Sequence, residues 1–156
     1  MKREKRIKWE PLLGIAPTVR LRNLKYELSL LILNLEDEID ESSPILTVNF
    51  SNFITFRIID ESDLLMGKYD DNNGDDYEYL IKIQKEKGYR YCWSLFIIEN
   101  SHYLKLFRRR DANINLDKSI VHYLIFTVHD VIEVLVPEDS IPTARWSQSD
   151  YDTLSN

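Results

Sequence analysis

Residues 91–137 constrain the fold of this chain more than any other stretch. An apolar run ends at Asn100 and Ser101, a short amphipathic segment follows, and two further apolar runs flank His129 and Asp130. Short runs rich in β-branched and aromatic residues, separated by polar turn residues, are typical of strands. The stretch therefore predicts a strand over residues 89–98, a capped helix ending near residue 110, and a hairpin of residues 120–128 and 131–136.

Two upstream stretches extend the β pattern. Residues 19–35 alternate apolar and polar side chains with a one-residue slip at Arg22 and Asn23, which favours a strand over the helix that the leucine spacing also allows. Residues 45–59 read as two strands, or one broken strand, with the break at Ser51 and Asn52. The expected buried face of the first stretch holds Leu24, Tyr26, Leu28, Leu30 and Ile32.

The middle of the chain carries weaker signals. Residues 60–66 could open a short helix, and residues 67–76 form a polar loop in which Asn73 and Gly74 indicate a tight turn. Residues 77–84 fit a strand and a helical turn equally well.

These patterns together predict a mainly β (α+β) fold, with an antiparallel sheet or sandwich of about six to eight strands and one or two short helices. A chain of 156 residues is expected to form one domain. We expect a basic lead-in over residues 1–18, with residues 1–8 as a solvated arm, a single β-rich domain over residues 19–137, and a loosely ordered polar tail over residues 138–156, pinned by Trp146.

The composition narrows the class of protein. The single cysteine, Cys92, excludes an intramolecular disulfide and is expected to act as a small buried hydrophobe. We see neither a signal-peptide pattern nor an apolar run that could span a membrane. A cytoplasmic protein without membrane contact is the expectation.

Motifs for catalysis, cofactors and metals do not emerge from the sequence. The three histidines, His102, His122 and His129, lack zinc-ligand spacing, and placing Gly74 at the glycine of a calcium loop puts the wrong residue types at its ends. Nucleotide-binding glycine motifs and a serine elbow are also missing. We therefore predict a non-catalytic protein with no cofactor and no metal, in which His122 is a buried, hydrogen-bonded core residue.

Two acidic segments are the strongest candidates for a binding surface. Residues 36–41 hold five carboxylates, and residues 70–78 hold five more beside tyrosines. Carboxylates next to tyrosine anchors suit a protein partner with a basic surface. The predicted contacts are Glu36, Asp37, Asp71, Asp75, Tyr77 and Tyr79.

Two alternatives stay open. One is a small-ligand-binding protein or enzyme with a pocket near His122, with Arg108 and Arg109 as an anion clamp. The other is a nucleic-acid adaptor that uses the basic N-terminus, although a net charge of −6 disfavours it. Pairing of exposed strand edges into a homodimer is a further open question.

The segments ENSHYLKLF at residues 99–107 and HYLIFTVHDVIEVL at residues 122–135 carry a resemblance to known proteins. With VNFSNFITFRIIDES at residues 48–62, they resemble a family of small bacterial β-rich proteins without assigned activity. That family is similar to the acidic single-domain immunity proteins encoded beside bacterial toxins. The resemblance implies a protein that acts by binding and neutralising a partner, and has no active site.

Overall fold

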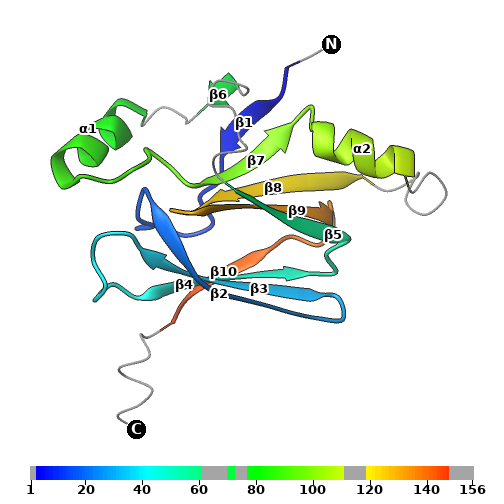
Figure 1. The fold of residues 1–156 in the computed structure, drawn as a ribbon, viewed down its shortest axis with the longest axis horizontal. Helices are drawn as coiled ribbons and strands as arrows, with labels where there is room; N and C mark the ends of the chain where they lie inside the picture. Colours follow the sequence, from blue (N-terminus) through cyan, green and yellow to red (C-terminus); the bar gives the residue numbers. More distant parts are fainter. Residues whose placement is uncertain (1–2, 61–69, 73–76, 111–118, 148–156) are drawn as a thin grey trace, which may run out of the picture.

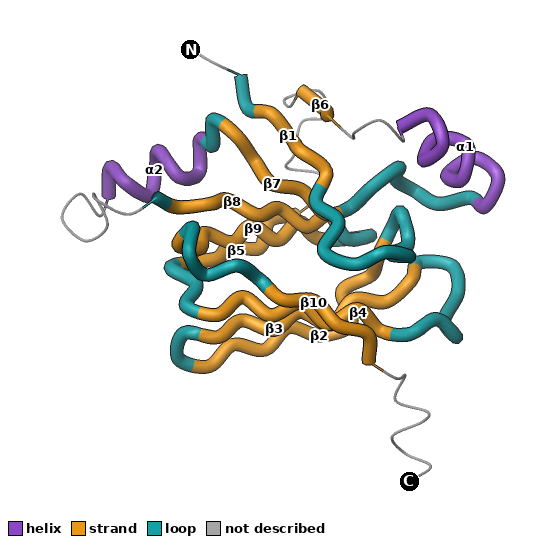
Figure 2. Tube along the Cα trace, turned by 180° about the vertical axis from the view of Figure 1, so that it is seen from behind, coloured by secondary structure: helices purple, strands orange, loops and turns teal. Residues whose placement is uncertain are grey.

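The structure is a computed structural model that describes residues 3–60, 70–72, 77–110 and 119–147. These residues form two stacked β-sheets, with the two helices at opposite ends of one layer (Figures 1 and 2). The predicted mainly β class is confirmed. Strands also form outside residues 19–137, so the sheets hold more strands than the sequence pattern indicated.

The larger sheet has six strands. In spatial order they are β5 (Thr55–Asp60), β9 (Asp130–Pro137), β8 (Ile120–Phe126), β7 (Leu95–Glu99), β1 (Lys5–Lys8) and β6 (Asp70–Asn72). Neighbouring strands are antiparallel except β1 and β6, which are parallel. The predicted hairpin is confirmed as β8 and β9.

The smaller sheet is an antiparallel meander of three consecutive strands, to which β10 adds a fourth. Its spatial order is β10 (Thr143–Ser147), β4 (Ile45–Ser51), β3 (Leu30–Asp37) and β2 (Val19–Glu27). The predicted slip in the first strand is a bulge between Leu21 and Asn23. The break after β4 is confirmed at Asn52, whose φ of 57° turns the chain toward β5 in the other sheet.

Helices α1 (Tyr77–Lys87) and α2 (His102–Arg110) flank the six-stranded sheet. The ambiguity of residues 77–84 is thereby settled in favour of a helix. Asn100, with φ of 57°, redirects the chain after β7. Ser101 then caps α2, because its Oγ accepts a hydrogen bond from the Leu104 amide at 2.9 Å.

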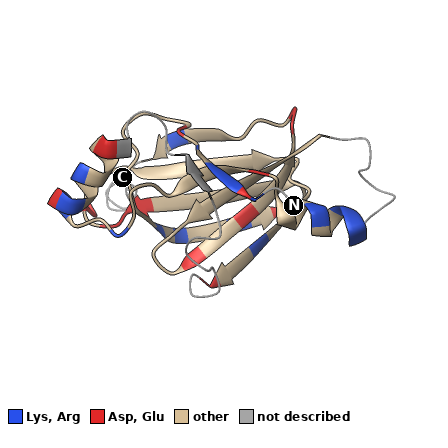
Figure 3. Ribbon diagram, turned by 90° about the horizontal axis from the view of Figure 1, so that it is seen from above, with Lys and Arg blue, Asp and Glu red and all other residues tan. Residues whose placement is uncertain are grey.

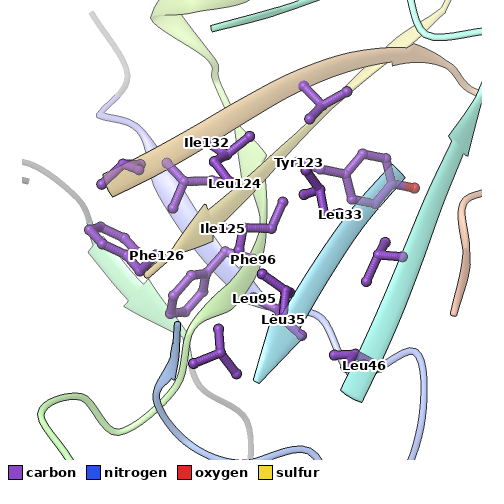
Figure 4. Close-up of a cluster of buried hydrophobic side chains, with 14 of the residues drawn as sticks. Leu33, Leu35, Leu46, Leu95, Phe96, Tyr123, Leu124, Ile125, Phe126 and Ile132 are labelled. Carbon is purple, nitrogen blue, oxygen red and sulfur yellow. The ribbon is translucent and has the colours of Figure 1, made fainter. Parts of the chain in front are cut away.

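The main core lies between the two sheets (Figure 4). Leucines of β3 and β4 face apolar residues of β7, β8 and β9, and both sets are almost fully buried. The central members are Leu33, Leu35, Leu46, Leu95, Tyr123, Ile125 and Ile132. The far face of the six-stranded sheet is also buried, and it holds Phe96, His122, Leu124, Phe126 and Glu133.

The expected buried face of residues 19–35 is wrong at Tyr26, which is 64% exposed, and throughout its second half. The stretch is a hairpin that turns at Leu28 and Ser29, and the residue before this connection, Glu27, pairs with Leu30. Because two residues connect the strands, even-numbered residues of β2 lie on the same face of the sheet as odd-numbered residues of β3. The inward residues of β3 are consequently Leu31, Leu33 and Leu35, whereas Leu28 is 95% exposed.

The predicted arm, the predicted tail and the predicted strand over residues 89–98 also differ from the structure. Part of the predicted solvated arm forms β1 inside the larger sheet, and part of the predicted loose tail forms β10 beside β4. The strand expected from residue 89 begins only at Leu95, because residues 89–94 instead hydrogen-bond to the lead-in and to the loop after β3. Within the predicted polar loop over residues 67–76, residues 70–72 form β6 beside β1. The helix expected over residues 60–66 lies outside the described residues except for Asp60, which ends β5, and the turn at Asn73 and Gly74 lies outside them as well.

Candidate functional site

Two adjoining cavities lie beside the chain segment that leads from β1 into β2. The larger, which we call the acidic groove, has a volume of about 740 Å³ and lies between this lead-in, α1 and the loop after β3. Its lining includes three carboxylates, those of Glu10, Asp37 and Asp40, and one ammonium group, that of Lys87. The smaller, which we call the apolar pocket, has a volume of about 300 Å³.

The apolar pocket is an uncovered end of the sandwich core. Leu35, Leu46 and Trp146 lie at paired positions on β3, β4 and β10, so their side chains share the inward face of the smaller sheet. Leu13 and Ile15 of the lead-in lie opposite them. The core therefore continues into a hollow that the lead-in only partly closes.

The lead-in is held firmly against the sheets. The Trp9 ring packs on Tyr123 with centroids 4.8 Å apart, and the Trp9 carbonyl accepts a hydrogen bond from Trp93 Nε1 at 3.1 Å. Further along, Ser94 Oγ donates to the Pro17 carbonyl at 2.7 Å. Both ends of the segment are thus fixed, and the two cavities are preformed.

The loop after β3 is also tied to the body of the protein. The Tyr89 hydroxyl lies 2.9 and 3.0 Å from the two carboxylate oxygens of Asp37. Burial, together with this hydrogen bond and the nearby carboxylate charge, raises the pKa of Tyr89 to about 12. The Arg90 amide donates to Glu38 Oε1 at 2.9 Å. Asp37 and Glu38 therefore stabilise the loop from within.

Asp40 lines the acidic groove and, like Glu41, is an exposed carboxylate of this loop. Its Oδ1 accepts hydrogen bonds from the Ser42 hydroxyl at 2.6 Å and the Ser42 amide at 3.0 Å, and these bonds lower the pKa of the Asp40 carboxyl. Glu10, on the lead-in side, forms an ion pair with Lys8 at 3.0 Å. Asp40 is thus held in its charged form at neutral pH and remains open to a partner.

Large apolar side chains stand exposed around both cavities. Tyr79 of α1 is 63% exposed, Leu13 is 83% exposed and Trp146 is 42% exposed. Ile39, beside Asp40, is 46% exposed. Several exposed apolar side chains around adjoining cavities, next to charged groups, are typical of an interaction surface.

The structure brings together only some of the predicted partner contacts. Asp37 and Tyr79 both line the acidic groove. Glu36 lies one residue earlier on β3, paired with Arg20 of β2. Asp71 belongs to β6 and Tyr77 begins α1, whereas Asp75 lies outside the described residues.

His122 is a buried core residue, as predicted. Its side chain is fully enclosed: Nδ1 lies 2.6 Å from Ser101 Oγ, and Nε2 lies 3.1 Å from Glu133 Oε1. Because Ser101 Oγ already accepts from Leu104, its own hydrogen is free to point at Nδ1, which leaves Nε2 to carry the ring proton toward Glu133. His122 does not line the apolar pocket, the acidic groove or the cavity beside Asn52 and Glu138.

Glu133 is the charged centre of this buried cluster. It also pairs with Arg57 of the neighbouring strand β5. Burial opposes ionisation of Glu133, but the hydrogen bonds from His122 and Arg57 outweigh it and lower the pKa of the carboxyl. The Arg57 guanidinium in turn stacks 4.0 Å from the Tyr103 ring centroid of α2. The cluster therefore fixes α2 on the sheet.

The basic residues of the chain divide into packed and exposed groups. The Arg6 guanidinium lies 5.0 Å from the Phe96 ring centroid, and Lys8 Nζ lies 4.5 Å from the Trp93 ring centroid. These two cations of the predicted N-terminal arm are thus part of the packing of β1. Arg108 and Arg109 lie in the exposed last turn of α2, where they complement the helix dipole (Figure 3).

Within the described ranges, no cluster of three or more His, Cys, Asp or Glu side chains could hold a metal ion. Within the same ranges, no helix is long and apolar enough to cross a membrane. Cys92 is half-buried, and its thiol lies 2.7 Å from Gln84 Oε1 of α1.

Comparison with known proteins gives no match: neither a protein-family model, nor a curated protein, nor a solved structure is similar to this chain.

Sequence reasoning missed half of the candidate surface. Glu10 and Leu13 belong to the predicted basic lead-in, and Trp146 to the predicted polar tail that it was expected to pin. The one available signal is the presence of apolar residues beside glycine and proline in residues 11–17, which does not show the alternation typical of a strand.

Proposed function

We propose that this protein is a non-catalytic protein-binding domain that engages a basic surface of a partner through the acidic groove. The observation that carries the proposal is the grouping of exposed Tyr79 and Ile39 with the carboxylates of Glu10 and Asp40 around one preformed hollow.

In this proposal the exposed apolar side chains and the carboxylates contribute to binding in different ways. Exposed tyrosine and branched aliphatic side chains supply buried area at low entropic cost when a partner covers them. Surface carboxylates of one sign speed the encounter with a cationic partner and disfavour acidic ones. The fixed lead-in and the tied loop reduce the ordering cost of association.

Residues 99–107 and 122–135 resemble a family of small bacterial β-rich proteins without assigned activity, and the similarity of that family to immunity-type proteins supports a narrower version. In it, the partner is a basic toxin in the bacterial cytoplasm, which this protein neutralises by covering a functional surface. The use of His122 and Glu133 in structural contacts favours binding over catalysis as the activity.

The test is a comparison of two baits in a lysate of the host organism. One bait is the tagged wild-type protein, and the other carries Glu10→Gln and Asp40→Asn, which remove two charges while retaining similar side-chain shape. We expect the wild-type protein to retain one stoichiometric basic protein that elutes with salt, and the variant to retain much less.

A matched control removes two charges elsewhere. Glu138 and Asp139 are exposed and line a separate cavity with Asn52 and Ser140. The double variant Glu138→Gln and Asp139→Asn should retain the partner like the wild-type protein. A clean negative for the wild-type bait at low salt, or equal loss in both double variants, would contradict the proposal.

A further inference from the structure

We propose that the apolar pocket receives one large apolar side chain of the partner, immediately next to a lysine or arginine that enters the acidic groove. The recognised element would be a short basic–apolar segment of a polypeptide. This inference rests on the proposed function and specifies the chemistry of the partner.

The walls of the apolar pocket are those of a protein core. Val19, Leu35 and Leu46 are at most 2% exposed and form its inner wall. Leu13 and Trp146, which are much more exposed, form its rim. An apolar side chain placed between rim and wall would remove apolar surface from water on both sides, which is the main favourable contribution to such binding.

The apolar pocket is large enough for one side chain and too small for a larger part of a partner protein. Its volume of about 300 Å³ is at the lower limit of the roughly 300–1,000 Å³ found for small-molecule sites. A tryptophan, phenylalanine or leucine side chain fits such a space, and a single aromatic anchor of this kind often dominates an interface.

The two cavities are near enough for one segment to enter both. Residues 14–16, Asp37 and Ser43 line both the apolar pocket and the acidic groove. At this shared wall Gly14 has φ of +84°, a conformation that glycine adopts without strain, so the chain passes between the cavities with no side chain at that position.

The charges beside the apolar pocket select the neighbouring residue. Among the described residues of its lining, the acidic groove has three carboxylates against the ammonium of Lys87, and a second ammonium, that of Lys8, pairs with one of the carboxylates, Glu10. A lysine or arginine next to the apolar anchor would meet this excess of negative charge, whereas an acidic residue there would be repelled.

Three tripeptides serve as probes of the full-length protein. They are acetyl-Lys-Trp-Lys-amide, acetyl-Lys-Ala-Lys-amide and acetyl-Glu-Trp-Glu-amide, titrated into the ¹⁵N-labelled protein and followed by amide chemical shifts. We expect the first to shift the amides of Gly14, Leu46 and Trp146, and the other two to bind about tenfold more weakly, since each lacks one of the two matched features.

Variants separate the pocket from the groove. Leu13→Ser opens the rim at an exposed site and should reduce the affinity for the Lys-Trp-Lys peptide to that for the Lys-Ala-Lys peptide. Leu28→Ser, which changes another strongly exposed leucine, in the β2–β3 turn, should leave the affinity unchanged. Equal affinities for the Trp and Ala peptides, both weakened by Glu10→Gln and Asp40→Asn, would overturn this inference and leave the proposed function standing.

Two further outcomes would overturn the inference. One is that none of the three peptides shifts the amides around the apolar pocket. The other is a wild-type dimer in sedimentation equilibrium that becomes monomeric with Leu13→Ser, because a second copy of the chain would then be the occupant. Tight binding of the Glu-Trp-Glu peptide would contradict both this inference and the proposed function.

Discussion

Tyr89 shows how one residue organises the candidate surface. Its hydroxyl donates to Asp37, and this bond holds the loop after β3 in the position that opens the acidic groove. The partly buried phenol and the nearby carboxylate both disfavour the tyrosinate. The geometry of the groove is therefore coupled to the protonation of Tyr89.

The pH dependence of this contact has a definite sign. The pKa of Tyr89 is raised from 10.0 to about 12, so its stabilising effect is complete below pH 10 and disappears as the pH rises through about 12. A tyrosinate absorbance titration of wild-type protein minus Tyr89→Phe should show one transition near pH 12. A difference transition near pH 10 would show that the Tyr89–Asp37 contact is not formed.

The contribution of Glu133 to stability has the opposite pH dependence. Its pKa is lowered below 4.5, so its contribution to stability is complete above that value and is lost as the pH falls through the folded-state pKa. Glu133→Gln removes the charge that Arg57 and His122 share, and should lower the free energy of unfolding at neutral pH by about 3 kcal/mol.

Urea denaturation at neutral pH and below pH 4.5 measures both effects. The Glu133→Gln protein should lose less stability on acidification than the wild-type protein. Glu138→Gln, at an exposed position, serves as the control and should match the wild-type protein at both pH values. Identical acid sensitivity of Glu133→Gln and wild-type protein would contradict the account of the buried cluster.

At the level of elements, Ser101 joins α2 to the sheet. It accepts a hydrogen bond from the Leu104 amide and contacts His122 Nδ1. Ser101→Ala removes a helix cap and leaves a buried ring nitrogen without a partner, so we expect a loss of about 2 kcal/mol in the free energy of unfolding. Ser119→Ala, at an exposed position before β8, should change it little in the same denaturation experiment.

The β2–β3 turn contains a strained residue. Leu28 has φ of 52° and is 95% exposed, so its side chain contributes almost no packing to offset the left-handed backbone. Leu28→Gly should raise the free energy of unfolding by about 0.5–1 kcal/mol, after the entropy cost of glycine. Leu28→Ala keeps the strain and should give no gain in thermal denaturation. A destabilised Leu28→Gly protein would contradict this reading of the turn.

Most strands were predictable from sequence because alternation is a local property, but the short strands β1, β6 and β10 were not. The bulge at Leu21 and Asn23, the break at Asn52 and the cap at Ser101 were each visible in a few residues. The buried face of β3 was not, since it depends on where the chain turns. Ser29 is the only common turn residue at this connection, and it is flanked by leucines, so alternation alone assigned the wrong face.

At the scale of the whole molecule, the candidate surface is made by segments far apart in sequence. The lead-in, the loop after β3, α1 and β10 meet at one end of the sandwich. Charge and tyrosine content pointed to Asp37 and Tyr79, whereas Glu10, Leu13 and Trp146 required knowledge of which strands lie side by side. His122 was recognised as a core residue because it lies on an apolar strand and outside any catalytic motif.

The central claim is that the acidic groove binds a basic partner. The most direct measurement is the dissociation constant of the partner retained by the wild-type bait, determined by isothermal titration calorimetry for three proteins of the same length. These are the wild-type protein, the Glu10→Gln and Asp40→Asn variant, and the Glu138→Gln and Asp139→Asn variant, the last two of which differ from the wild type by the same net charge.

We predict an affinity at least about tenfold weaker for the groove variant, since two carboxylates facing the cations of the partner lose their charge, and an unchanged affinity for the control variant. Equal affinities for all three proteins would contradict the claim that the acidic groove is the interface.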